Sequence, residues 1–171
     1  MSGPLGSSQW MYTTEEYEIE KSVRLIKDDA SYFGFTPGSA GNRRTWTYSA
    51  WIKLGKLTIQ RSFLSATGSE YTDLRVNSDD DLEFYIDDTQ STATKLITDA
   101  KLRDPAAWYH IVIAFDTTQG TAANRIKLYA NGQQLTMVSA TYPDQNTEAR
   151  FNEDALTTIG AGSDNESVDG H

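Results

Sequence analysis

The segment 108–138 constrains the fold of this chain more than any other part of the sequence. It begins with Trp108 to Phe115, a run rich in aromatic and β-branched residues whose only strongly polar side chain is His110. Such a run predicts a strand that is buried on both faces. The rest of the chain then has to supply the layers that cover this strand.

The second half of the same segment predicts a β-hairpin. Asn131-Gly132 stands between two apolar segments, 126–130 and 133–138. An Asn-Gly pair favours a type I′ turn, because both central residues of that turn need positive φ. We therefore expect 133–138 to return along 126–130 as its antiparallel partner.

Short apolar segments of the same kind recur along the chain, separated by Gly, Pro, Asn and Asp. No stretch shows a sustained helical period, and turn signals recur about every 8–12 residues, as in all-β folds. The sequence predicts an all-β fold, an antiparallel β-sandwich of the jelly-roll type with about ten strands. The expected strands outside 108–138 are 22–26, 31–35, 45–54, 61–66, 73–77, 82–86, 95–97 and 155–159.

The segment 45–54 alternates strictly between apolar and polar positions. Its even-numbered side chains form one apolar face, and its odd-numbered side chains form a polar face on which Trp51 is the exception. We expect the apolar face to join the core. The predicted core comprises Val23, Leu25, Trp46, Tyr48, Ile52, Leu64, Val76, Phe84, Ile86, Trp108, Ile111, Ile113, Phe115, Ile126, Leu128, Leu135 and Ile159.

Composition and charge exclude several classes of partner. The chain of 171 residues has a formal net charge of -9, which disfavours nucleic acid and anionic membranes. It has no cysteine, so disulfides and thiolate metal sites are excluded. No run reaches the roughly 18 apolar residues of a membrane span, so we expect no membrane insertion.

Several blocks of residues match a known family in the order in which the family has them. They are 39–53, 103–112, 116–119, 124–132, 142–146 and 158–160, with Trp-Tyr-His at 108–110 and Leu-Tyr-Ala-Asn-Gly at 128–132 as the most specific. The chain resembles the concanavalin A-like jelly-roll superfamily in its laminin G-like and pentraxin-like branch over about residues 22–160. It is most similar to the laminin G-like domains of tailed-phage and cyanophage virion proteins.

The resemblance implies three parts and an open edge. Residues 1–14 are expected to be a flexible segment, 15–160 the laminin G-like sandwich, and 161–171 a loop. Related domains close with one more strand after the Ile-Gly segment, and 161–171 contain no apolar strand. We expect an unpaired sheet edge, left either by truncation or cleavage of the chain before the closing strand or for self-association or a partner to complete. Trp10, Met11 and Tyr12 in the first segment would assist such association.

The resemblance further implies a non-enzymatic structural, decoration or fibre-type domain of a virion, which contacts a host glycan or neighbouring virion proteins. The same fold outside a virus would be an extracellular, calcium-dependent lectin module. A glycoside hydrolase is the third alternative, because Glu16, Glu18 and Glu20 alternate on one strand. Glucanases of the superfamily carry Asp at the middle position and place the motif within the sheet, so a solvated edge strand fits these residues better.

The candidate sites lie mainly in turns. Asn77, Asp79 and Asp81 supply oxygen ligands at an acidic turn, and calcium is the one cofactor that the sequence offers, although the EF-hand spacing is absent. His110 is expected to be a partly buried strand residue with satisfied hydrogen bonds. The candidates for sugar recognition are aromatic and amide side chains that an exposed surface could present: Trp51, Tyr71, Tyr142 and Asn146.

Overall fold

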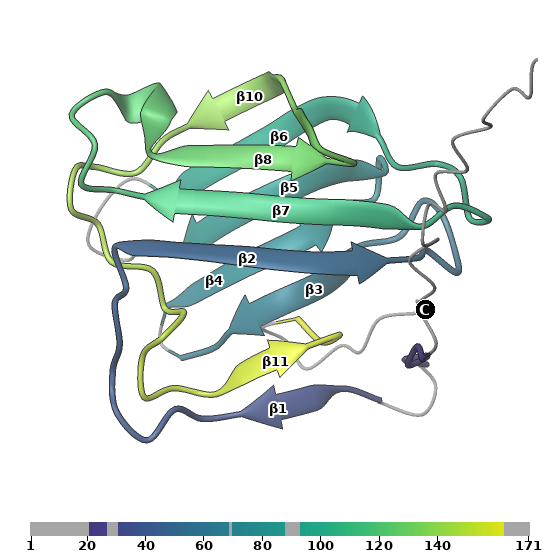
Figure 1. Cartoon of the computed structure of the whole chain (residues 1–171), viewed down its shortest axis with the longest axis horizontal. Coiled ribbons are helices and arrows are strands. Elements are labelled where there is room, and N and C mark those ends of the chain that lie inside the picture. Colours follow the sequence, from purple (N-terminus) through teal and green to yellow (C-terminus); the bar gives the residue numbers. More distant parts are fainter. Residues whose placement is uncertain (1–20, 27–30, 69, 88–92, 163–171) are drawn as a thin grey trace, which may run out of the picture.

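The computed structural model describes residues 21–26, 31–68, 70–87 and 93–162, which form a two-layer antiparallel β-sandwich (Figure 1). The larger sheet contains, in spatial order, β1 (Phe33–Phe35), β11 (Thr157–Ile159), β3 (Arg61–Ala66), β4 (Tyr71–Val76), β5 (Asp81–Asp87), β6 (Thr94–Lys101) and β10 (Met137–Thr141). The smaller sheet contains β2 (Thr45–Ile52), β7 (Tyr109–Asp116), β8 (Ile126–Ala130) and β9 (Gln133–Gln134), and a 3-10 turn, η2 (Ala122–Asn124), precedes β8. The predicted all-β sandwich is confirmed.

The Asn-Gly hairpin forms where the sequence predicts it. Asn131 has φ 50° and Gly132 has φ 79°, as a type I′ turn requires. The returning segment, however, is not a single strand. β9 pairs with β8 over two residues, and β10 then pairs with β6 of the opposite sheet. The chain changes sheets at Thr136, whose carbonyl accepts the N–H of Asp99 at 3.1 Å, so the prediction of one strand over 133–138 is wrong.

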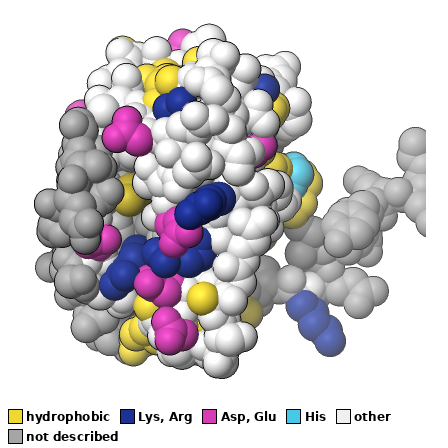
Figure 2. All heavy atoms as spheres, turned by 90° about the vertical axis from the view of Figure 1, so that its left-hand side faces the viewer, with side chains coloured by type: hydrophobic (Ala, Val, Ile, Leu, Met, Phe, Trp, Pro, Cys, Tyr) yellow, Lys and Arg dark blue, Asp and Glu magenta, His cyan; other side chains and the backbone are white. Residues whose placement is uncertain are grey.

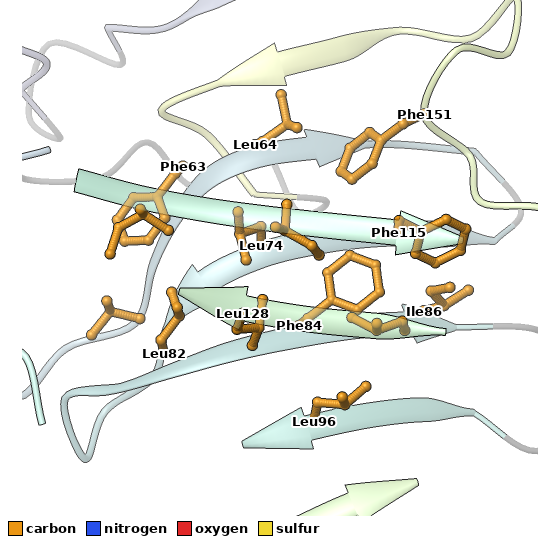
Figure 3. Close-up of a cluster of buried hydrophobic side chains, with 14 of the residues drawn as sticks. Phe63, Leu64, Leu74, Leu82, Phe84, Ile86, Leu96, Phe115, Leu128 and Phe151 are labelled. Carbon is orange, nitrogen blue, oxygen red and sulfur yellow. The ribbon is translucent and has the colours of Figure 1, made fainter. Parts of the chain in front are cut away.

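The core lies between the two sheets (Figure 3). One row of directly opposed residues in the larger sheet runs through Leu64, Leu74, Phe84 and Leu96. These side chains meet Phe115 and other apolar residues of β7 and β8, and aromatic rings join the layers. Trp46 stacks on Phe115 with ring centroids 4.7 Å apart and meets Phe151 edge-on at 5.2 Å.

β7 is buried on one face only, which corrects the prediction for 108–115. Its inward residues Ile111, Ile113 and Phe115 are at most 1% exposed, whereas the outward side chains of His110 and Val112 are half-buried. The apolar run 108–115 predicted that a layer of the protein covers each face of this strand. Within the described residues, the second layer is absent from the outer face of the smaller sheet.

The segment 22–26 is also not the regular strand that its sequence predicts. Within it, only Leu25 makes an isolated β-bridge, and Val23 is 56% exposed rather than part of the core. Leu25 instead lies against Gly160, where an added Cβ would come within 2.0 Å of the Leu25 Cδ1 atom. Gly160 has φ +85°, so this position favours glycine for both conformation and space.

Ion pairs connect two loops at one end of the sandwich, where acidic and basic side chains gather (Figure 2). Arg43, just before β2, pairs with Glu148 at 3.0 Å and with Glu153 at 3.3 Å. Arg150 pairs with Glu153 at 2.7 Å. These contacts hold the segment before β2 against the segment that leads into β11.

The larger sheet extends beyond the smaller one at its β1 edge. Figure 1 shows β11 and β1 lying past β2, with no described strand of the smaller sheet in front of them. Phe33 and Phe35 therefore remain 50% and 52% exposed although they point to the inner side of the sheet. In the described part of the chain, β2 has a strand neighbour on one side only.

Candidate functional site

Trp51 is an exposed indole on the outer face of the smaller sheet. The alternation of β2 directs Trp46, Tyr48, Ala50 and Ile52 inward, and it directs Trp51 outward, as predicted. The side chain is 49% exposed. A large aromatic group that is left half in water is suited to packing against the apolar face of a ligand.

His110 holds the Trp51 ring in place from the neighbouring strand. The two residues are directly opposed in the β2–β7 pairing, and their rings stack at 5.0 Å with an interplanar angle of 24°. His110 Nε2 lies 2.8 Å from the Ser49 hydroxyl. The backbone N–H of His110 donates to Asn131 Oδ1 at 2.9 Å. The prediction of a satisfied, half-buried histidine is confirmed, and the contacts orient Trp51.

The outer face around this aromatic pair is polar. One register row places Ser49, Val112, Tyr129 and Gln134 side by side on β2, β7, β8 and β9. Hydroxyl and amide groups of this row can donate and accept hydrogen bonds. Trp51 together with Ser49, His110, Tyr129 and Gln134 is termed the Trp51 surface below. The sequence analysis identified only Trp51 of these residues as a candidate for sugar recognition. It missed Ser49, His110, Tyr129 and Gln134, although the period of two placed Ser49 on the face of Trp51.

A pocket of about 370 Å³ opens on the other side of Trp51, between the edge of β2 and the overhanging strands. Tyr48, Ile52, Phe63, Ile159 and Trp108 contribute apolar surface to it. Burial in this region raises the pKa of the Tyr48 hydroxyl above its usual range. The pocket thus presents aromatic and aliphatic groups where the sandwich is uncovered.

The charged residues that line this pocket, among those described, are all basic. They are Lys21, Lys53 and Arg61, and Arg61 is only 1% exposed. No carboxylate of the described residues lines the pocket, although the chain as a whole carries a net charge of -9. The described lining of the pocket therefore differs in charge from the chain as a whole.

Tyr71 belongs to a different region, the outer face of the larger sheet. Its ring lies 5.4 Å from that of Tyr85, and the Arg75 guanidinium lies 5.3 Å from the Tyr85 ring. Arg75 forms ion pairs with Asp73 and Glu83, both of which are almost fully buried. These ion pairs give Asp73, Arg75 and Glu83 a structural role on this face of the larger sheet.

Burial raises the pKa of Asp73 to about 6, although Arg75 and the Ser62 hydroxyl act in the opposite direction. The Ser62 hydroxyl donates to Asp73 Oδ2 at 2.9 Å. A raised pKa beside a second carboxylate is one signature of a catalytic site. Here one guanidinium holds both carboxylates.

The acidic turn at 77–81 is organised by hydrogen bonds within the turn and by ion pairs to Lys101 and Arg103. Asn77 Oδ1 accepts the N–H groups of Asp79 at 2.9 Å and of Asp81 at 3.0 Å, and Asp81 pairs with Lys101 at 2.6 Å. The buried Asp80 pairs with Arg103 at 3.2 Å. Among the described residues, no group of three or more His, Cys, Asp or Glu side chains could hold a metal ion. The structure gives no support to the predicted calcium ligands Asn77, Asp79 and Asp81.

The remaining sugar candidates do not lie with Trp51. Tyr142 packs against the core, and the Asn146 N–H donates to the Thr117 carbonyl, just beyond the end of β7, at 2.9 Å. Trp51, on β2, pairs instead with His110 near the start of β7. The four predicted residues therefore occupy separate places. Glu16, Glu18 and Glu20 and the segment with Trp10, Met11 and Tyr12 lie outside the described residues.

The chain matches one protein family and several solved structures. The sequence profile of the concanavalin A-like lectin/glucanases superfamily matches residues 27–171. Domains LG4-5 of the mouse laminin α1 chain are similar in fold, with a TM-score of 0.54 and 14% identity over 77% of this chain. This chain spans only 32% of that laminin structure.

A carbohydrate-binding module also has this fold. The CBM40 of the Ruminococcus gnavus IT-sialidase has a TM-score of 0.53 and 15% identity, over 81% of this chain and 84% of the module. The same CBM40 bound to α2,3-sialyllactose has a TM-score of 0.53 and 14% identity, again over 81% of this chain and 84% of the module. A comparison with curated proteins gives no significant match. Identities this low show the fold and leave function to the site.

Among the described residues, no helix is long and apolar enough to cross a membrane.

Proposed function

The chain belongs to the concanavalin A-like lectin/glucanase superfamily, and we propose that it is a lectin-like, non-enzymatic glycan-binding domain. The observation that carries this proposal is the Trp51 surface: a half-exposed indole stacked on His110, with hydroxyl and amide groups on the same face of the sheet. The apolar face of one sugar ring packs on the indole, and Ser49 on the same strand binds its hydroxyl groups. Tyr129 and Gln134, two and three strands away, bind further units of a longer glycan. His110 acts as a positioning residue.

A glycan array followed by titration calorimetry tests this proposal. Sialyllactose and lactose are the first probes, because a CBM40 of the same fold is known with sialyllactose bound. We expect the substitution Trp51→Ala to weaken binding at least about tenfold, the equivalent of one lost aromatic contact of about 1.4 kcal/mol. Thr47→Ala, on the same face of β2, is the matched control and keeps its affinity.

Two outcomes decide against the proposal. The array shows no binding to any glycan, or the Trp51→Ala variant binds as tightly as the parent protein. Circular dichroism of the variant confirms that the sheet is intact. Titrations with calcium and with a chelator separate this proposal from the calcium-dependent alternative, which requires affinity to fall on chelation.

The absence of catalysis is part of the proposal. Asp73 and Glu83 are buried carboxylates that both pair with Arg75, and this shared contact supports a structural role. Incubation with a panel of β-glucans and other polysaccharides is expected to release no sugar. Turnover that disappears in Glu83→Gln would establish a hydrolase instead.

We further propose that the domain is part of a virion or another extracellular assembly. The support is the order of the sequence blocks around 39–53 and 103–132, which resembles virion domains. None of the solved structures described above is a virion protein. Mass spectrometry of purified particles that contain this chain tests the proposal, and its absence from every particle fraction contradicts it.

A further inference from the structure

The strand β1 forms one edge of the larger sheet and exposes apolar groups. β11 lies on one side of it, and no strand of the described residues lies on the other (Figure 1). All three of its residues, Phe33, Gly34 and Phe35, are exposed. Tyr32, just before the strand, is 46% exposed, and Leu156 is 39% exposed. An edge strand with exposed apolar side chains is a site for pairing with another chain.

Apolar groups lie on both faces of this edge. The Cβ that Gly34 lacks would lie 3.4 Å from Leu156 Cδ1 and 3.4 Å from Tyr32 Cε2, so both side chains lie over the outer face of β1. Phe33 and Phe35 occupy the opposite, inner face. Each half-exposed ring leaves on the order of 100 Å² in water. A partner that pairs with β1 therefore gains apolar contact on both faces of the sheet.

The segment that contains β1 carries no charge. Residues 31–38 read Ser-Tyr-Phe-Gly-Phe-Thr-Pro-Gly, in a chain whose formal net charge is -9. Edge strands that resist association usually carry charged side chains, lysine in particular. Two copies of the chain can therefore meet at this edge without like charges on the strands that pair, and salt screens the repulsion between their net charges.

Two hydrogen bonds show in which direction the backbone of β11 is bonded. The Thr67 N–H donates to the Leu156 carbonyl at 3.1 Å, and the Gly160 N–H donates to the Phe63 carbonyl at 3.3 Å. In an antiparallel sheet, successive residues of a strand bond alternately to its two neighbours. The even-numbered residues from 156 to 160 therefore bond to β3, and the odd-numbered residues bond to β1.

The backbone of Gly34 consequently faces the free edge. The odd-numbered residues of β11 are opposed to Phe33 and Phe35, whose backbone groups are therefore directed to β11. Gly34 stands between them, so its N–H and carbonyl point away from β11. The centre of β1 thus offers one donor and one acceptor side by side, which is the pattern that a further antiparallel strand requires.

We propose that β1 pairs with β1 of a second copy of this chain, antiparallel and about a two-fold axis at Gly34. The sequence Phe-Gly-Phe is the same in both directions, so this rotation places Gly34 opposite Gly34 of the second copy and Phe33 opposite Phe35 of the second copy. The glycines exchange N–H···O bonds, and the phenylalanines occupy non-hydrogen-bonded pairs, where side chains lie closest. This inference is independent of the Trp51 surface and of glycan binding.

The size of the contact sets the strength of the dimer. Three rings and one leucine in each copy, together with the backbone of the edge, bury roughly 1,000 Å² in total, which is at the lower limit of specific interfaces. We expect a dissociation constant of about 10–100 µM, with tighter association at higher salt. The protein is then a monomer when dilute and a dimer when concentrated.

Sedimentation velocity of the full chain from about 1 to 500 µM tests the proposal, and we expect a shift from monomer to dimer. The double substitution Phe33→Lys and Phe35→Lys places like charges opposite one another and keeps the protein monomeric. The matched control is Val138→Lys on β10, a 68% exposed residue at the opposite edge of the same sheet, which dimerises like the parent. Circular dichroism shows that both variants are folded.

Three results of this experiment overturn the proposal. The parent protein stays monomeric over the whole range, the dimer persists in the double-lysine variant, or Val138→Lys abolishes it.

A change of one charge tests the register. Phe33→Lys combined with Phe35→Glu places each lysine opposite a glutamate only if the strands are antiparallel about Gly34. We expect this variant to dimerise at least about tenfold more tightly than the double-lysine variant, and the difference fades at high salt. Equal association of the two variants contradicts the proposed pairing.

Amide exchange at Gly34 distinguishes a second copy from a segment of the same chain. In the proposed dimer, exchange at Gly34 slows as the protein is concentrated, because its N–H is bonded only in the dimer. The Phe35 N–H, which is directed to β11, is the internal reference and changes less. If a segment of the same chain covers the edge, Gly34 is protected equally at every concentration in a monomer, and the proposal is overturned.

Discussion

The covered and overhanging parts of the larger sheet differ in exposure although they belong to one register row. In this row, each residue pairs directly with the next across neighbouring strands. The row crosses β1, β11, β3, β4, β5 and β6 and consists of Phe33, Ile159, Leu64, Leu74, Phe84 and Leu96. Phe84 is 0% exposed and Phe33 is 50% exposed. The side chains point the same way, so the difference comes from the opposing layer. A residue contributes to the core only where the four strands of the smaller sheet reach.

The largest effect is expected in the covered part. Phe84 meets Trp46 and Phe115, and its removal leaves a cavity between the sheets. We expect Phe84→Ala to lower the free energy of unfolding by about 3–5 kcal/mol. Urea denaturation followed by tryptophan fluorescence measures this change. A loss below 1 kcal/mol would show that the two parts of the sheet are energetically alike.

The outer face of the larger sheet supplies the second prediction, which concerns the dependence of stability on pH. Burial raises the pKa of Asp73 to about 6 from 3.8. Between these values the folded protein binds more protons than the unfolded chain, so stability falls as pH rises through this window. Relative to Asp73→Asn, the parent protein should lose up to about 3 kcal/mol between pH 4 and pH 7. Urea denaturation at several pH values measures the difference, and parallel curves would contradict a raised pKa.

The junction between the two parts of the sheet gives the third prediction. Gly160 follows β11, has φ +85° and lies directly against Leu25. Alanine at this position is strained, and it displaces the Leu25 side chain. We expect Gly160→Ala to cost about 1–2 kcal/mol. Gly120→Ala is the control, because nothing lies within 4 Å of the Cβ that it would add. Equal stability of the two variants would show that Leu25 is not held against Gly160.

The smallest effect is expected in the overhang. Phe35 on β1 is 52% exposed, and its truncation creates no enclosed cavity. We expect Phe35→Ser to change the free energy of unfolding by less than about 1 kcal/mol. Comparison with Phe84→Ala under the same conditions tests the contrast directly. A loss near 3 kcal/mol for Phe35→Ser would mean that another layer covers this side of the sheet.

The local sequence predicted several elements correctly because their signals are local. The Asn131-Gly132 turn follows from backbone conformation, and β3 and β8 have the predicted bounds. The outward position of Trp51 follows from the alternation of β2. The resemblance in blocks such as 124–132 led to the superfamily that the sequence profile confirms. These properties depend on neighbours within a few residues.

The candidate site was only partly accessible from the sequence. Trp51 was identified as an exposed aromatic residue, but its support by His110 depends on the register between β2 and β7. The other candidates for sugar recognition, Tyr71, Tyr142 and Asn146, lie in other places. Hydrogen bonds and ion pairs within the acidic turn involve Lys101 and Arg103, which the turn sequence does not contain. Pairing between distant segments decided which polar groups stand together.

The sequence by itself determined most of the strands, the alternation of β2 and the turn that joins β8 to β9, because each depends on conformational preferences of adjacent residues. Only the tertiary structure decided that the chain crosses between sheets at Thr136. It also decided that the outer face of β7 stays uncovered and that β1 and β11 extend past β2. The physical reason is that burial of a strand depends on a second layer, whose extent is set by pairing between distant parts of the chain. The same apolar pattern can therefore form core, open groove or binding surface.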